Sequence, residues 1–465
     1  MTHRYKRLAT LLVALLPMAM CAQELRTAYL MHTSKNRHQM NPAYLLGQPY
    51  LGLPTLSNVY VGYQSTYGAN LLLYPIKPKN PGDPTLGTFL HPQVSEADVL
   101  RKLGNKDLRS DVHVNYGFFS CAFNSFGGTN LVELNVRANA SVVLPGELIR
   151  FAKQVGSRKT YSFSNLGVRS SAYVELALGH SRELDSHWTV GSKFKMLFGA
   201  GHAQARLNDV NVEMHADRWR VSGHATGRAS IINAGLVADD EGDITLKTDA
   251  KHRAGLGFGV ALDLGARYKV HGMENLELSA AITDLGFIRY GSGQHLATPH
   301  KTWEFAGFKD AYIASDKINS QEVGKTLEQM GDDLKDLAKF KLGSERGFTE
   351  TLATTINLGA EYTLPSYKQL SFGLVTTHRF AGLHSWHQAM AIARVRPHKV
   401  VEVGVSGGLS TTGVTWGTMF TLQARRFQFF TGIEAHLSTL SREYIPTERS
   451  ATSVNFGMTI PLGKN

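Results

Sequence analysis

The chain has 465 residues, of which 43% are hydrophobic, 9% aromatic and 19% charged, with 45 glycines, two cysteines and a formal net charge of +11. This hydrophobic content can bury a large core, which excludes a disordered chain, and two cysteines exclude a disulfide scaffold. The sequence has no uninterrupted apolar run of about 18 residues, which excludes a polytopic helical membrane protein.

Residues 1–22 have the pattern of a secretory signal peptide. A basic start is followed by an apolar run, and Ala22 is the small residue before a predicted cleavage site. Lipid attachment to Cys21 is the alternative, but Met20 stands where lipoprotein processing favours a small residue. We therefore expect an exported mature chain with one cysteine, Cys121, and no intramolecular disulfide.

Residues 23–55 precede the first predicted strand and contain three prolines. If the following strands close into a barrel, we expect this segment to fold inside it as a hatch, with Asn41 and Pro42 fixing a turn. The alternative is an ordered periplasmic tail.

From residue 56 the chain alternates with a period of two, which predicts strands. In the clearest run, 254–270, apolar side chains occupy one face, and glycines, Asp263 and basic residues occupy the other. Most such runs reach ten or more residues, longer than the strands of a soluble sandwich. Their length favours a closed antiparallel transmembrane β-barrel, an all-β fold, over residues 56–465.

We predict about fourteen strands, joined alternately by short and long connections. This is the pattern of outer-membrane barrels, which have short periplasmic turns and longer outer loops. The predicted strands lie at 56–67, 111–123, 130–143, 168–182, 187–203, 254–270, 275–289, 348–363, 369–380, 386–396, 399–409, 413–424, 426–437 and 452–462. Aromatic residues near the strand ends fit interfacial girdles: Tyr60, Trp188, Tyr268, Tyr290, Tyr362, Trp386 and Tyr444.

Two outer connections contain predicted helices, at 144–156 and 318–342. In the second, Val323, Leu327 and Met330 begin an apolar stripe at helical spacing. The stripe predicts either a helix that binds a partner or gates the barrel, or one that packs on the loops above the barrel.

No motif predicts catalysis, a metal or a cofactor, so we expect a chain that is not an enzyme. His384 and His387 flank a hairpin, but two ligands are too few for a metal site. The glycines of 255–259 follow one strand face rather than a phosphate loop, and the acidic run resembles a calcium loop that lacks its last ligand. That run consists of Asp239, Asp240, Glu241 and Asp243. Basic residues are spread thinly along an exported chain, which argues against nucleic-acid binding.

Several stretches carry a family resemblance. Residues 38–44 (HQMNPAY), 282–291 (ITDLGFIRYG) and the closing 453–463 resemble a large family of Bacteroidetes-type outer-membrane barrels, catalogued as domain of unknown function family 5723. That family is more distantly similar to fourteen-stranded long-chain fatty-acid transporters and to the shuttle barrel of the type IX secretion system. The resemblance implies a barrel in the outer membrane and no established chemistry.

The closing stretch also resembles the assembly signal that the outer-membrane insertion machinery reads. Its matching residues are Asn455, Gly457, Ile460 and Leu462, although Gly463, Lys464 and Asn465 follow in place of the usual aromatic end. The resemblance implies contact with outer-membrane lipid, lipopolysaccharide and the barrel assembly machinery.

These observations predict a channel or transporter for a small solute, with a hydrophobic solute among the options. The alternative is a non-enzymatic scaffold or secretion-associated protein, whose outer loops at 204–253 and 290–347 bind a secreted protein. No motif marks the residues that would bind a ligand.

Overall fold

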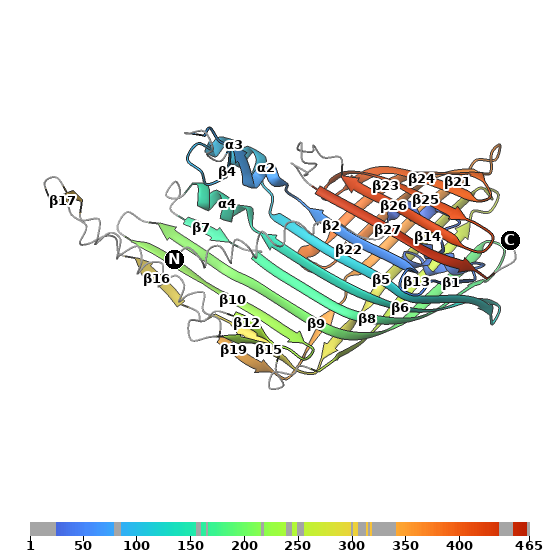
Figure 1. Cartoon of the computed structure of the whole chain (residues 1–465), viewed down its shortest axis with the longest axis horizontal. Helices are drawn as coiled ribbons and strands as arrows, with labels where there is room; N and C mark the ends of the chain where they lie inside the picture. Colours follow the sequence, from blue (N-terminus) through green and yellow to red (C-terminus); the bar gives the residue numbers. More distant parts are fainter. Residues whose placement is uncertain are drawn as a thin grey trace.

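The computed structural model describes residues 25–78, 85–154, 160–163, 166–214, 218–238, 244–248, 255–298, 301–305, 313–314, 317–318, 341–436 and 450–462. Fourteen antiparallel strands form a closed barrel (Figure 1). They are β2 (Asn58–Ser65), β5 (Leu108–Ser125), β6 (Gly128–Leu144), β8 (Leu166–Glu183), β9 (Trp188–Met214), β13 (Gly257–Lys269), β14 (Leu276–Tyr290), β21 (Thr354–Thr363), β22 (Leu370–Phe380), β23 (Trp386–His398), β24 (Val401–Ser410), β25 (Gly413–Gln423), β26 (Gln428–His436) and β27 (Ser450–Pro461).

Closure is made by β2, which pairs with β27 on one side and β5 on the other. The predicted barrel and its strand number are confirmed. One predicted strand, 348–363, is two pieces in the structure, β20 (Phe348–Thr351) and β21, which both pair with β14. Because no edge is left open, these long strands do not offer a template for aggregation.

The first barrel strand begins earlier than the predicted 56–67. β1 (Tyr50–Gly52) pairs with the same two neighbours as β2, and residues 53–57 interrupt the strand between them. Thr55 has a φ of 67°, in the left-handed region, next to Pro54. The interruption breaks the alternation, so the sequence pattern does not reach β1.

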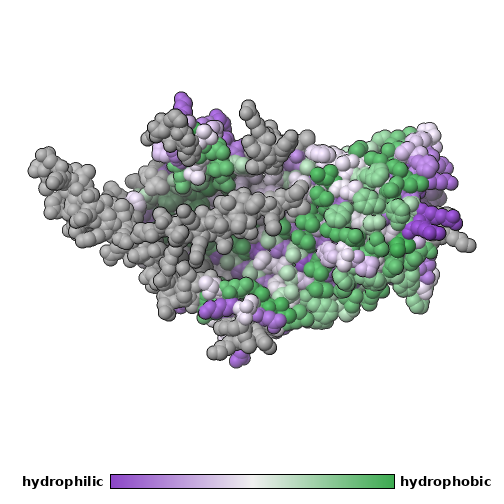
Figure 2. Space-filling view, viewed as in Figure 1, coloured by the Kyte–Doolittle hydropathy of each residue, from purple (hydrophilic) through white to green (hydrophobic). Residues whose placement is uncertain are grey.

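The alternation of side chains is confirmed along the barrel strands. Large apolar side chains point outward and are exposed, and Figure 2 shows them as a broad hydrophobic surface over the strands. Acidic, basic and amide side chains point inward and are buried, among them Glu133, Glu175, Lys193, Lys195, Asp263, Arg394, Glu402 and Asn455. This is the reverse of a soluble protein, and it suits a wall with lipid outside and a polar lumen.

Three of the predicted girdle aromatics face the interior instead. Tyr60, Tyr290 and Trp386 are 2%, 1% and 4% exposed, because each lies on the inward parity of its strand. Trp188 and Tyr362 are exposed, and the Trp188 ring lies 4.7 Å from that of Tyr268. Tyr444 lies outside the described residues.

The long outer connections contain strands that the sequence pattern does not predict. β9 runs on past the barrel and pairs with β10 (Trp219–Ile231), which in turn pairs with β15 (Gly293–Ala297) and β16 (Lys301–Phe305). β19 (Lys341–Glu345) pairs with β15. β10 carries no continuous apolar face, so it gives no period-two signal. β7 (Thr160–Phe163) pairs with β9. Short two-stranded hairpins complete the connections: β3 (Leu73–Pro75) with β4 (Leu86–Thr88), β11 (Gly235–Ala238) with β12 (Ile244–Lys247), and β17 (Ile313–Ala314) with β18 (Lys317–Ile318).

Helices are few among the described residues. The helix predicted at 144–156 is α4 (Gly146–Lys153), and the first outer connection adds α2 (Ala69–Leu72) and α3 (Glu96–Leu103). Most of the predicted helix 318–342 falls at 319–340, outside the described residues. In the parts of the chain that the structure describes, no helix has the length and apolar character needed to cross a membrane.

Candidate functional site

Residues 25–49 lie within the ring of strands, in the half that carries the short turns. Three short 3₁₀ helices, η1 (Arg26–Leu30), η2 (Lys35–Gln39) and η3 (Pro42–Leu45), make up most of this N-terminal segment, and all their residues are buried. Its side chains and backbone bond to strands around the whole circumference, from β6 and β8 through β13, β14 and β21 to β24 and β26.

Inward-facing glycines make the room for this segment. A Cβ atom added at Gly265 would overlap the side chains of Asn41 and Pro42, and one at Gly191 would overlap the backbone of Pro42 and Ala43. On five more strands a Cβ atom would meet side-chain atoms of the segment, at Gly359, Gly373, Gly404, Gly417 and Gly432. The high glycine content therefore has a specific use, since any other side chain at these positions would fill the space that the segment occupies.

Buried carboxylates of the wall hold the segment by hydrogen bonds. Glu434 accepts from the Thr27 backbone N–H at 2.7 Å and from its hydroxyl at 2.8 Å. Glu402 accepts from the backbone N–H groups of His32 and Thr33 at 3.1 and 2.9 Å. These bonds satisfy charged groups that would be costly to bury alone, so the wall is matched to the segment.

Asn41 and Pro42 lie where η3 begins. The Asn41 side chain accepts from the Ala43 backbone N–H at 3.0 Å, and its amide donates to the carbonyl oxygens of Ala266 at 3.2 Å and Ala280 at 3.4 Å. Pro42 occupies the first position of η3, where its missing N–H costs no hydrogen bond. Asn41 thus caps η3 and joins it to β13 and β14.

Two basic side chains of the segment, His38 and Lys35, are buried in surroundings that disfavour their charged forms. Burial and the nearby Lys193 ammonium keep the pKa of His38 well below its usual range. Its Nε2 lies 2.8 Å from the Tyr50 hydroxyl and 3.5 Å from Glu133, which also lies 3.4 Å from Lys193. Burial and the positive charge of Arg396 lower the pKa of Lys35 to about 8.

Two adjoining cavities lead from the N-terminal segment toward the long-loop end. The inner one, of about 70 Å³, touches the segment at Arg26, Gln39 and Met40, and the outer one, of about 40 Å³, reaches Glu350 and His384. Five residues line both: His113, Asn139, Tyr173, Asp284 and Arg379. Since a buried water needs about 10–15 Å³, these spaces have room for several waters.

Asp284 lies in a β-bulge that turns it into the lumen. The pairing of β13 with β14 shifts register between Leu262 and Leu264, and Asp284 has a φ of 58°. Its backbone N–H donates to Asp263 at 2.7 Å, and its carboxylate lies 2.6 Å from Lys195 and 3.1 Å from Arg137. Left-handed backbone in a strand interior is strained and is tolerated best by Asn, Asp and Gly, which accounts for an aspartate here.

The residues of the assembly-signal resemblance lie on β27 and just beyond it. Asn455 faces inward and donates to the Asn58 side chain at 2.7 Å, and Gly457 lies against the Phe430 ring. Ile460 is partly exposed, and Leu462 follows the strand with 53% of its surface exposed.

His384 and His387, which the sequence places on either side of a hairpin, do not form a joint site. His384 Nδ1 lies 3.6 Å from Asp111 in the lumen, whereas His387 is exposed on the outer face, with its Nδ1 3.1 Å from that of His378. The acidic run 239–243 lies outside the described residues, and the residues that are described hold no group of three or more metal-binding side chains.

Sequence reasoning missed the lumen residues Arg379 and Asp284. Asp284 carried a usable signal, because the ITDLG stretch breaks the alternation between Thr283 and Asp284. Arg379 carried none, because an inward-facing arginine in a strand resembles every other polar lumen residue.

Comparison with known proteins finds one matching family and several solved structures of similar fold. The model of a family of unknown function, DUF5723, matches residues 42–434. No curated protein matches the chain. Among solved structures, the Ralstonia pickettii toluene transporter TbuX is similar in fold at 8% identity and a TM-score of 0.43, covering 92% of this chain and 94% of that one.

Two further barrels show the same likeness. The monoaromatic hydrocarbon channel CymD has 8% identity and a TM-score of 0.44, covering 93% and 94% of the two chains. A Pseudomonas aeruginosa FadL homologue has 9% identity and a TM-score of 0.40, covering 91% and 93%. These likenesses concern the fold, whereas the family match extends over most of the sequence. The protein therefore belongs to the family of unknown function DUF5723.

Proposed function

We propose that this protein is a non-enzymatic outer-membrane channel or transporter that passes a small solute through the barrel lumen, with residues 25–49 as its hatch. The observation that carries the proposal is the N-terminal segment seated in the lumen against glycines and carboxylates of the wall. The cavities beyond it are narrow and polar. Passage of anything larger than water then requires the segment to shift.

The way the segment is held suits a movable hatch. Its bonds to the wall run from side chains such as Glu402, Glu434 and Asn357 rather than through a continuous strand ladder. Each such bond contributes about 0.5–3 kcal/mol, so they are released one by one at modest cost. The chain beyond residue 49 enters β1, which tethers the segment to the wall.

Deletion of residues 26–48 tests the proposal in planar bilayers. We expect the single-channel conductance to rise, because the deletion leaves β1 intact and empties the lumen. A double variant, Glu402→Gln with Glu434→Gln, should open intermittently, since each loses one charge-assisted acceptor. Glu183→Gln, exposed at the short-turn end of β8, is the matched control. Unchanged conductance after the deletion would contradict both the hatch and a passage through the lumen.

The strands beyond the barrel favour a second candidate, a scaffold that binds a secreted protein. β10, β15, β16 and β19 extend the sheet past the barrel at its long-loop end (Figure 1). A photo-crosslinker at Arg220, partly exposed on β10, should capture a partner in intact outer membranes, and one at Leu184 on a short turn should not. Recovery of the uncrosslinked barrel from both positions would count against a scaffold.

A further inference from the structure

The cavity wall is polar, which bears on the class of solute. Of the five residues that line both cavities, four carry a charge or an amide or imidazole group and the fifth is Tyr173. Counting both cavities, four arginines (Arg26, Arg137, Arg169 and Arg379) face three carboxylates (Asp111, Asp284 and Glu350). A hydrocarbon entering this space would strip water from charged groups and return no hydrogen bonds.

The lumen carboxylates already have cationic partners. Asp284 is paired with Lys195 and Arg137, and Glu350 lies 2.8 Å from Arg169 and 2.6 Å from His202 Nδ1. A cationic solute would have to compete with these groups at close range. The wall therefore does not offer a free negative site at the level of the cavities.

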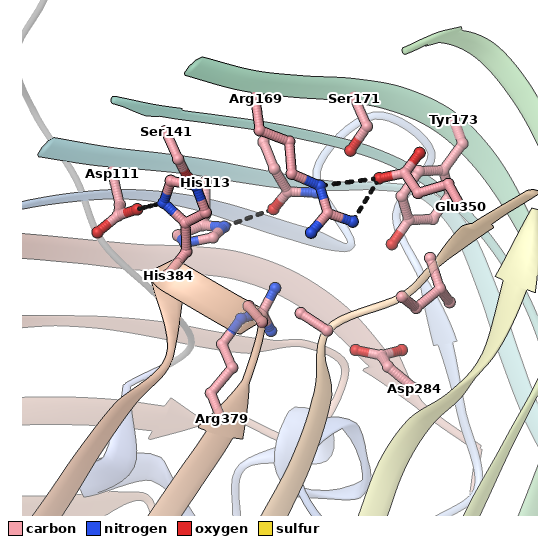
Figure 3. A pocket seen from close by; sticks show the side chains of 14 residues that line it. Asp111, His113, Ser141, Arg169, Ser171, Tyr173, Asp284, Glu350, Arg379 and His384 are labelled. Carbon is pink, nitrogen blue, oxygen red and sulfur yellow. Dashed lines mark hydrogen bonds and ion pairs between the residues drawn. The ribbon is translucent and has the colours of Figure 1, made fainter. Parts of the chain in front are cut away.

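Arg379 differs from the other arginines of the wall. It projects inward from the long-loop end of β22, and Figure 3 shows it pointing into the space between His113 and Asp284. Among the described residues, its guanidinium makes one weak donation, to the Thr355 hydroxyl at 3.4 Å, and it forms no ion pair with a carboxylate. A guanidinium has five N–H donors and keeps its charge. Most of the N–H donors of Arg379 are therefore left to bond a solute in the cavity.

We propose that Arg379 is an anion-binding residue of the passage, and that the solute is a small polar carboxylate rather than a hydrocarbon. A carboxylate would take two parallel N–H bonds from the guanidinium, with the Asn139 amide and the Tyr173 hydroxyl on the same wall to bond its remaining polar atoms. This inference takes the proposed passage through the lumen as its premise.

Equilibrium dialysis with the full chain in detergent tests the anion site without transport. The probes are labelled succinate and its uncharged counterpart of the same size, succinamide. We expect the wild-type protein to bind succinate at least about tenfold more tightly than succinamide, because a charge-assisted pair contributes about 1.5–3 kcal/mol. Arg379→Gln should remove the preference, and Arg379→Lys should keep part of it.

The matched control is Arg289→Gln, an exposed arginine at the long-loop end of β14. It should bind succinate as the wild type does, and heat-modifiable migration on a gel shows that each variant is folded. Equal binding of the two probes, or a preference that survives in Arg379→Gln, would overturn the anion site. Uptake by proteoliposomes tests the transport function separately from the anion site. If succinate binds but does not enter the proteoliposomes, the anion site is supported and the transport function is contradicted.

Discussion

Gly265 shows how one missing side chain shapes the lumen. It lies on β13 where Asn41 and Pro42 pass, and a Cβ atom there would overlap both. We expect Gly265→Val to weaken the seating of the N-terminal segment by about 1–3 kcal/mol, the usual cost of overpacking. Limited proteolysis in detergent should then cut residues 25–49 faster than in the wild type.

Gly255 is the matched control for this substitution. It lies just before the same strand, and a Cβ atom there would meet nothing within 4 Å. Gly255→Val should therefore leave the cleavage rate unchanged. Equal protection of the segment in both variants would show that it tolerates the overlap and is not seated tightly.

His38 predicts how seating depends on pH. Its pKa lies well below the usual value when buried, so the seated imidazole stays neutral while a released one takes up a proton near pH 6.5. Proton uptake by the released form favours release, so seating should weaken as the pH falls through about 6.5. His38→Gln removes the titrating group and should flatten proteolysis rates measured between pH 8 and pH 5. A steep loss of protection that persists in the variant would assign the pH dependence to other groups.

At the scale of the element, the two faces of each barrel strand have different surroundings. Leu374, in the middle of β22, points outward and is 53% exposed, while its neighbour Val375 faces the interior and is buried. Leu374→Arg should lower the free energy of unfolding by about 2–4 kcal/mol if that face meets lipid near the bilayer midplane.

Leu184 provides the comparison, because it is 60% exposed but lies on a short turn. Leu184→Arg should cost about 1 kcal/mol or less, since the penalty falls toward the interface. Chemical unfolding in lipid vesicles measures both. Similar costs at the two sites would contradict a lipid-facing middle of β22.

At the scale of the whole molecule, the fold predicts where the protein is found and how it behaves on purification. We expect it in the outer-membrane fraction, dependent on detergent for solubility, with a heat-modifiable shift on a gel because a closed barrel resists unfolding by the detergent. N-terminal sequencing should find Gln23 as the first residue if Ala22 precedes the cleavage site. A mature chain that stays dissolved and monomeric without detergent would contradict the membrane assignment.

The sequence by itself predicted a barrel of about fourteen strands and the facing of side chains in its clearest runs, because each strand carries its own alternation and the two faces of the wall need opposite chemistry. It misplaced Tyr60, Tyr290 and Trp386, because an aromatic ring suits a lipid interface and a packed interior equally well.

Only the tertiary structure decided what meets inside the ring. Closure sets the stagger between strands, so it alone determines that glycines of seven strands lie level with residues 25–49. It also brings Asp284 and Arg379, from strands two positions apart, to one cavity. No local sequence pattern around either residue predicts that the two lie close together. Contacts across a lumen depend on register and closure, which no local pattern encodes.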